Sequence, residues 1–294
     1  MKVRSVLATI LLMFSFASAY AAQSTITEAD GTACMGDDKS RKQTEDSALT
    51  DAKRKAVEHV STYLTSESKV TNFVLEKDLL SAYAHAEVKL IQELSKEWYK
   101  DPNAGDCLKL KIKAEVVPDT KAIEKMTAAS PAAFDDPSAP LKVKAWTDKK
   151  EYKEGEKIKV YIKGNKPFYA RVLYKDANGE IVQILPNPYR TDNYFNGGAM
   201  YEVPTGNDKF ELEVSPPFGE ENVIVYASSS PLGEISTEAH GGVYEVKTQA
   251  RDIGVKTRGI RLMERTENKT SGVSTSKPAA SEFFEDKVVV KTGK

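Results

Sequence analysis

Hydrophobic residues recur at two different spacings along this chain of 294 residues. Between positions 48 and 64 they return every three or four residues, which is the spacing of one buried face of an α-helix. Between positions 108 and 116 they alternate with charged residues, as in a strand with one face in a core. Asp37, Asp38 and Ser40 precede the first stripe and are residue types that cap helix N-termini. The pattern predicts a long amphipathic helix whose apolar stripe is Ala48, Leu49, Ala52, Ala56, Val57, Val60, Tyr63 and Leu64.

Weaker patterns complete a first unit over 23–126. Residues 24–34 fit a short strand and 75–85 a short helix. Residues 86–99 fit either a helix or a strand; we favour a strand because the turn-rich segment 101–106 joins them to the next strand. This unit is predicted to be an α/β domain, a long helix on a small antiparallel sheet.

The remaining chain is predicted to be all β, so the whole belongs to the α+β class. Residues 127–140 are rich in Ala, Ser and Pro and predict a linker. From 141 to 250 short alternating strands follow one another with turn residues between them, which predicts an all-β sandwich or an open barrel; we take the β-sandwich. The C-terminal extension, 251–294, is predicted to be partly disordered, with a candidate final strand at 285–292.

The first 22 residues have the pattern of a secretory signal peptide. Lys2 and Arg4 precede an apolar run from Val6 to Phe16, and the small residues near Ala19 to Ala22 offer a cleavage site. The run is too short to span a bilayer, so we expect no stable membrane insertion. The mature chain is expected in the periplasm or outside the cell.

The two cysteines, Cys34 and Cys107, are expected to form a disulfide, because an isolated pair in an oxidising compartment is more often bridged than free. The alternative is two free thiols, with Cys107 acting as a nucleophile beside His85. The signature motifs of serine hydrolases, zinc peptidases, P-loop proteins and CxxC proteins are absent from the sequence. We therefore expect no catalytic site, no metal and no cofactor.

The charge balance argues against a nucleic-acid partner. The chain has 42 Lys and Arg against 43 Asp and Glu, a formal net charge of -1, whereas nucleic-acid binders normally have a basic excess.

Asp176, Asn178 and Glu180 faintly resemble a calcium loop, but the twelve-residue ligand sequence is missing and a hairpin explains them better. Several lysines alternate with apolar residues, which indicates a solvated strand face or, as the alternative, contact with an anionic polymer. These lysines are Lys142, Lys144, Lys157, Lys159 and Lys163.

Tyr189, Tyr194 and Phe195 lie in the Pro/Asn/Gly-rich segment 186–198. Aromatic side chains on loops often form recognition surfaces, and they also close the ends of sandwiches. These three residues are the candidate binding residues of the chain, and a carbohydrate or polymer is the ligand class that such rings favour.

Two groups of residues carry resemblances to known families. The first group is Asp148, Tyr152, Gly155, Phe168-Tyr169-Ala170, Tyr174, Gly179, Leu185-Pro186-Asn187, Asn193, Gly197, Pro204 and Val225 to Gly233. With these residues, about 143–233 resembles an uncharacterised bacterial domain found in secreted proteins and beside serine/threonine kinase or caspase-like peptidase domains. That family has no established activity, so it implies a module without a mechanism.

The second group lies in the first unit: Gly31-Thr32-Ala33, Ala48, Leu49, Asp51-Ala52, Ala56-Val57 and Ala114-Glu115-Val116. With these residues the first unit is similar to the N-terminal domain of flagellar assembly protein T and to related envelope lipoproteins. The resemblance implies an α/β domain for assembly or interaction in the envelope.

Together these observations predict an exported, non-catalytic envelope protein that acts in protein–protein interaction or assembly. Envelope proteins are the expected partners, with a glycan or an anionic polymer as the alternative ligand. Two other functions remain open: a carbohydrate- or polymer-binding module, and a cysteine-dependent enzyme that uses Cys107.

Overall fold

A computed structural model describes residues 22–67, 80–123, 135–240, 243–259 and 280–294. The predicted signal peptide up to residue 21, most of the predicted linker and residues 260–279 of the C-terminal extension lie outside the described residues.

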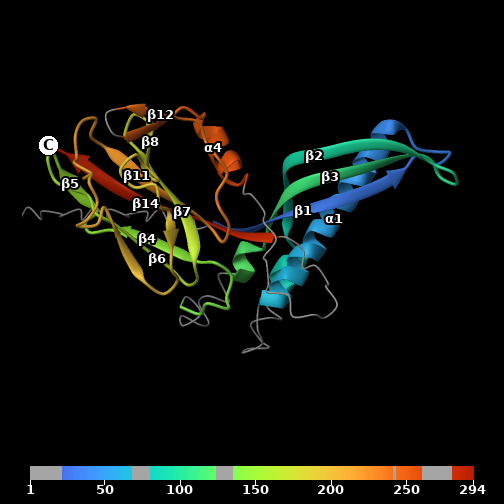
Figure 1. The fold of residues 1–294 in the computed structure, drawn as a ribbon, viewed down its shortest axis with the longest axis horizontal. Helices are drawn as coiled ribbons and strands as arrows, with labels where there is room; N and C mark the ends of the chain where they lie inside the picture. Colours follow the sequence, from blue (N-terminus) through green and yellow to red (C-terminus); the bar gives the residue numbers. More distant parts are fainter. Residues whose placement is uncertain (1–21, 68–79, 124–134, 241–242, 260–279) are drawn as a thin grey trace, which may run out of the picture.

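The described chain is mostly β and is built around one large, almost entirely antiparallel sheet of eleven strands (Figure 1). Hydrogen-bonded neighbours follow the order β12-β13-β8-β7-β11-β14-β1-β3-β2, with β5 attached to β14 and β9 to β7. A second sheet has the order β10-β6-β4. The bounds are β1 Ala22–Cys34, α1 Arg41–Glu67, β2 Glu87–Asp101, β3 Gly105–Val117, β4 Val143–Thr147, β5 Glu151–Lys153, β6 Val160–Gly164, β7 Phe168–Lys175, β8 Ile181–Leu185, β9 Tyr194–Phe195, β10 Met200–Val203, β11 Glu220–Ser228, β12 Thr237–His240, β13 Val243–Val246, α4 Ala250–Thr257 and β14 Ala280–Gly293.

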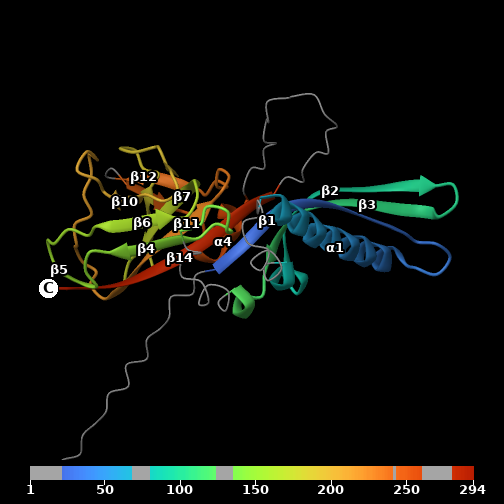
Figure 2. The ribbon, with the colours of Figure 1, turned by 90° about the horizontal axis from the view of Figure 1, so that it is seen from below.

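The N-terminal part is an arm in which α1 lies along β1 and β3 (Figure 2). Helix α1 covers the predicted stripe, and its most buried members recur every four residues: Ala48, Ala52, Ala56, Val60 and Leu64. Ser40 caps the helix in a reciprocal pair, since its hydroxyl accepts the Gln43 N–H at 3.3 Å while the Gln43 side chain accepts the Ser40 N–H at 2.8 Å. Residues 86–99, which fitted a helix or a strand, lie in strand β2.

A close approach at Gly31 explains why small residues line this helix face. A β-carbon added to Gly31 would lie 2.0 Å from the Ala48 carbonyl oxygen and 2.7 Å from the Ala52 β-carbon. Because the obstacle is helix backbone, a larger residue must push α1 away from β1.

We expect Gly31→Ala to lower the free energy of unfolding by about 2–3 kcal/mol, as overpacking of a fixed contact does. Gly206→Ala is the matched control, because nothing lies within 4 Å of a β-carbon added at Gly206; its expected effect stays within about 0.5 kcal/mol. Urea unfolding followed by circular dichroism measures both. Equal stability of the two variants would show that the helix moves away without cost.

The C-terminal part has its core between the inner face of β7, β8, β11 and β14 and the small sheet β10-β6-β4. The predicted hairpin at 176–179 joins β7 to β8: Asp176 accepts the N–H groups of Asn178 and Glu180, and Gly179 has φ 92°. This arrangement explains the turn residues that faintly resembled a calcium loop. The opposite face of the large sheet carries a smaller cluster that includes Ile253 of α4.

Strand β14 is longer than the predicted 285–292 and is central to the large sheet, not peripheral. It pairs with β1 through residues 280–285 and with β11 through residues 283–291, so that one sheet passes through both parts of the chain. Beside it, Arg258 after α4 contacts Glu115 of β3 at 2.7 Å and Glu285 of β14 at 3.0 Å. The strand content predicted for the chain is confirmed, whereas its division into an α/β domain and a separate sandwich stays a prediction.

Candidate binding site

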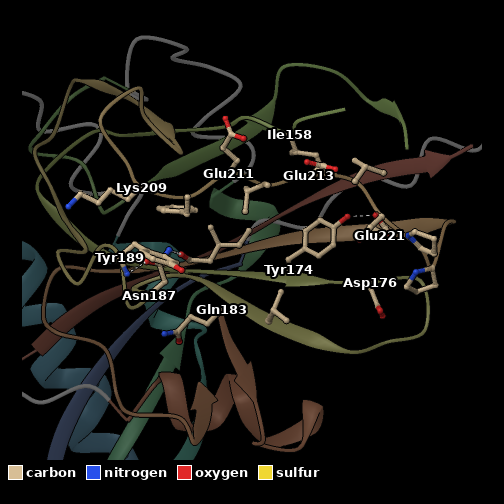
Figure 3. A pocket seen from close by; sticks show the side chains of 18 residues that line it. Ile158, Tyr174, Asp176, Gln183, Asn187, Tyr189, Lys209, Glu211, Glu213 and Glu221 are labelled. Carbon is tan, nitrogen blue, oxygen red and sulfur yellow. Dashed lines mark hydrogen bonds between the residues drawn. The ribbon is translucent and has the colours of Figure 1, made fainter. Parts of the chain in front are cut away.

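Residues of the C-terminal part line an open cavity of about 510 Å³ beside its core. Its floor is the inner face of β7, β8 and β11, and its roof is the segment 209–217 (Figure 3). Backbone hydrogen bonds from Ile158 to Leu212, from Gly155 to Val214 and from Val214 to Glu156 join this roof to the segment between β5 and β6. The cavity size is typical of sites that take a small molecule or a peptide side chain.

One wall of the cavity is aromatic. The Tyr189 ring stacks on Phe210 of the roof, with centroids 6.5 Å apart and planes at 18°, and 52% of Tyr189 stays exposed. Asn187 fixes this loop from beneath, because its side-chain oxygen accepts the N–H groups of Tyr189 and Arg190, both at 2.8 Å. Arg190 in turn pairs with Asp208 at 3.1 Å. The wall is therefore held in place before any ligand arrives.

The opposite wall carries a buried carboxylate. Glu221 of β11 accepts a hydrogen bond from the Tyr174 hydroxyl of β7 and is only 2% exposed. Figure 3 shows these two side chains meeting at one end of the cavity, with Tyr189 and Asn187 at the other. Burial and the neighbouring Glu221 carboxylate raise the pKa of the Tyr174 hydroxyl, so it stays protonated and donates.

Charged residues also lie around this space: Asp176, Glu211, Glu213, Glu221 and Lys209. Three of them, Lys209, Glu211 and Glu213, are exposed and alternate along the roof with core-facing apolar residues, so Glu221 is the buried carboxylate of the cavity. Glu211 is neutralised from outside by Lys157, at 2.6 Å. The cavity thus combines aromatic and aliphatic walls with one buried carboxylate.

The three aromatic residues singled out in the sequence do not come together. Tyr189 lines the cavity, whereas Tyr194 of β9 contacts Tyr169 edge to face, with centroids 5.1 Å apart. Phe195 is 1% exposed and stacks on Phe168 at 5.2 Å, because the short strand β9 turns it into the core. The expectation that Phe195 belongs to an exposed recognition surface is therefore wrong.

The predicted disulfide is confirmed: Cys34 and Cys107 are bonded and are direct partners across β1 and β3. As a nucleophile Cys107 would need a free thiol, and the disulfide leaves it none. His85 contacts the Ser81 carbonyl oxygen at 3.4 Å.

Within the ranges that the structure describes, no group of three or more His, Cys, Asp or Glu is placed to hold a metal ion. No helix of those ranges has the length and apolar character needed to cross a bilayer.

The lysines on the outer strand faces are largely engaged. Three of them contact carboxylates at 2.6 Å: Lys157 with Glu211, Lys159 with Glu202 and Lys163 with Asp135. This pairing fits the solvated-face interpretation, while contact with an anionic polymer stays an untested prediction.

One of three comparisons with known proteins finds a similarity for part of the chain. Residues 151–231 match the family described as a domain of unknown function, DUF4384. This range contains the whole cavity, and the match supports the resemblance stated for the second unit. No curated protein and no solved structure matches the chain. The resemblance of the first unit to flagellar assembly protein T stays a prediction.

The sequence interpretation missed Glu221 and Asn187. A signal for Glu221 was present, since strand alternation places it on the same face as Val223 and Val225. Asn187 had no such signal, because its role depends on a loop conformation that local pattern does not reveal.

Proposed function

We propose that this chain is an exported, non-catalytic binding protein of the cell envelope, and that a partner protein docks at the cavity beside Tyr189. The observation that carries the proposal is the preformed cavity, with an exposed aromatic ring at its mouth and apolar walls behind. The disulfide and the signal-peptide pattern support export, since disulfides persist in oxidising compartments.

On this proposal the two predicted domains have different tasks. The sandwich over 141–250 carries the docking site, and the α/β unit over 23–126 is the scaffold that supports it. Tyr189 supports the first assignment, because tyrosine gives a large contact area for little conformational entropy and is enriched among residues that dominate binding energy.

Site-specific crosslinking in living cells tests the proposal. A photoreactive phenylalanine analogue at Tyr189 is expected to trap a partner protein, identified by mass spectrometry. The same analogue at Tyr99 of β2, another exposed tyrosine, is the matched control and is expected to trap nothing above background. Tyr189→Ala is expected to weaken binding of the identified partner about tenfold or more.

Two outcomes contradict the proposal. Equal trapping at both positions would mean that the cavity has no special role. Binding to a glycan array that is lost in Tyr189→Ala, with no protein trapped, would favour the carbohydrate-binding alternative.

A further inference from the structure

Glu221 breaks the pattern of its own strand. Along β11 the residues of the inner face are apolar and buried, as at Val223 and Val225. Glu221 occupies the next position of the same face and is 2% exposed, whereas its neighbour Glu220 points to solvent. A carboxylate is costly at a core-facing position, and such departures from pattern concentrate where a protein binds or reacts.

The protein gives this carboxylate little compensation. Its hydrogen bond comes from the neutral Tyr174 hydroxyl, and among the described side chains no lysine, arginine or histidine lies within 4.0 Å of it. Buried carboxylates are normally paired with a cation or held by several donors. The cavity is the side from which a counter-charge can approach Glu221.

The cavity has the shape and charge that a basic side chain requires. Glu221, which is 2% exposed, lies at one end of the cavity, and Tyr189, which is 52% exposed, lies at the other (Figure 3). Aliphatic and aromatic groups such as Leu212 and Phe210 can cover a long methylene stem, and the faces of aromatic rings attract cations. The buried carboxylate of Glu221 favours a positively charged occupant over a neutral or anionic one.

We propose that the cavity binds a lysine or arginine side chain of the partner protein, with the cationic end at Glu221 and the methylene stem between Tyr189 and Leu212. This inference rests on the proposed function. The side chain enters from a peptide segment that crosses the mouth. Glu221 is then the residue that determines specificity for positive charge.

The test uses the full mature chain, with its disulfide intact, and three capped tripeptides of glycine flanking arginine, lysine or citrulline. Nuclear magnetic resonance titration is expected to show saturable shifts at residues 174, 189, 212 and 221 with the arginine or lysine peptide. Citrulline, which has the shape of arginine without its charge, is expected to bind at least about tenfold more weakly. Because the attraction is ionic, added salt is expected to weaken binding.

Glu221→Gln keeps an acceptor for the Tyr174 hydroxyl and removes the charge. It is expected to weaken binding of the basic peptides about tenfold or more and to raise the melting temperature of the free protein by about 2–4 °C, since a buried unpaired charge is relieved. Glu220→Gln makes the same chemical change on the exposed face of β11 and is expected to leave both quantities unchanged.

Unchanged binding in Glu221→Gln, equal binding of the citrulline peptide, or the absence of saturable shifts would each overturn this inference. If crosslinking at Tyr189 traps a partner while the basic peptides fail to bind, the docking function stands and only the cationic specificity is refuted. If neither experiment succeeds, both proposals fail.

Discussion

Glu282→Ala is expected to lower the free energy of unfolding by about 3–5 kcal/mol, the cost of breaking a buried ion pair by removing one partner. Glu282 lies on β14 and is 2% exposed. Its carboxylate contacts the Lys166 ammonium at 3.0 Å, accepts the Leu141 N–H and lies 3.5 Å from the Tyr63 hydroxyl of α1. The Glu282 side chain therefore contacts three separate parts of the chain: α1, the segment before β4 and the loop before β7.

The size of the effect follows from what the substitution leaves behind. The Lys166 side chain is only 13% exposed, so its ammonium would remain largely desolvated without a counter-charge. The Leu141 N–H would also lose its acceptor in a buried position. These losses fall where β14 passes between the N-terminal arm and the C-terminal core, so both parts are expected to loosen together.

Urea unfolding of Glu282→Ala, Lys166→Ala and the double variant measures this contribution. The double variant is expected to lose less than the sum of the two single losses, because the second substitution removes the charge that the first leaves unpaired. Glu220→Ala, a change of the same type at an exposed site, is expected to stay within about 0.5 kcal/mol of the parent protein. Strict additivity would mean that the two charges do not depend on each other.

The elements of the arm could be predicted because their signals are local. The alanine stripe of α1 and the alternation along β3 each predict a buried apolar face, and both faces are buried in the structure. The other face of β3 is not all exposed as predicted, because Lys113 and Glu115 are buried, the latter against Ser24 and Arg258. The central role of β14 could not be predicted in the same way. Its partners on β1 are about 260 residues away in sequence, and no local pattern states which of many compatible strands will pair.

The candidate site was predictable only in part. Tyr189 was found because a turn-rich segment exposes its aromatic ring, but the same reasoning wrongly included Phe195. The side chain of Phe195 points into the core because Phe195 lies in the two-residue strand β9. A strand this short is too short to show an alternating hydrophobic pattern in the sequence. Glu221 could have been found by continuing the alternation of β11 backward by two residues from Val223. Its partner Tyr174 could not, because that contact joins different strands.

Reducing the disulfide is expected to lower the free energy of unfolding by about 4 kcal/mol, from the chain entropy of a loop of 73 residues. The bond joins the end of β1 to the start of β3, far along the arm from the junction with β14. Beyond it, the backbone bond from the Met35 N–H to the Asp106 carbonyl continues the pairing. Loss of the bridge is therefore expected to release this end of the arm first.

Urea unfolding with and without reductant tests the energy, and hydrogen exchange tests the location. The double variant Cys34→Ser/Cys107→Ser is the control, since its unfolding curve is expected to be insensitive to reductant and close to that of the reduced parent. Exchange is expected to accelerate more at residues 30–36 and 105–110 than in β7 and β11, because local opening follows the contacts that are lost and adds to the loss of global stability. Uniform acceleration through β7 and β11 would contradict local release and would mean that the arm and the C-terminal core unfold as one cooperative unit.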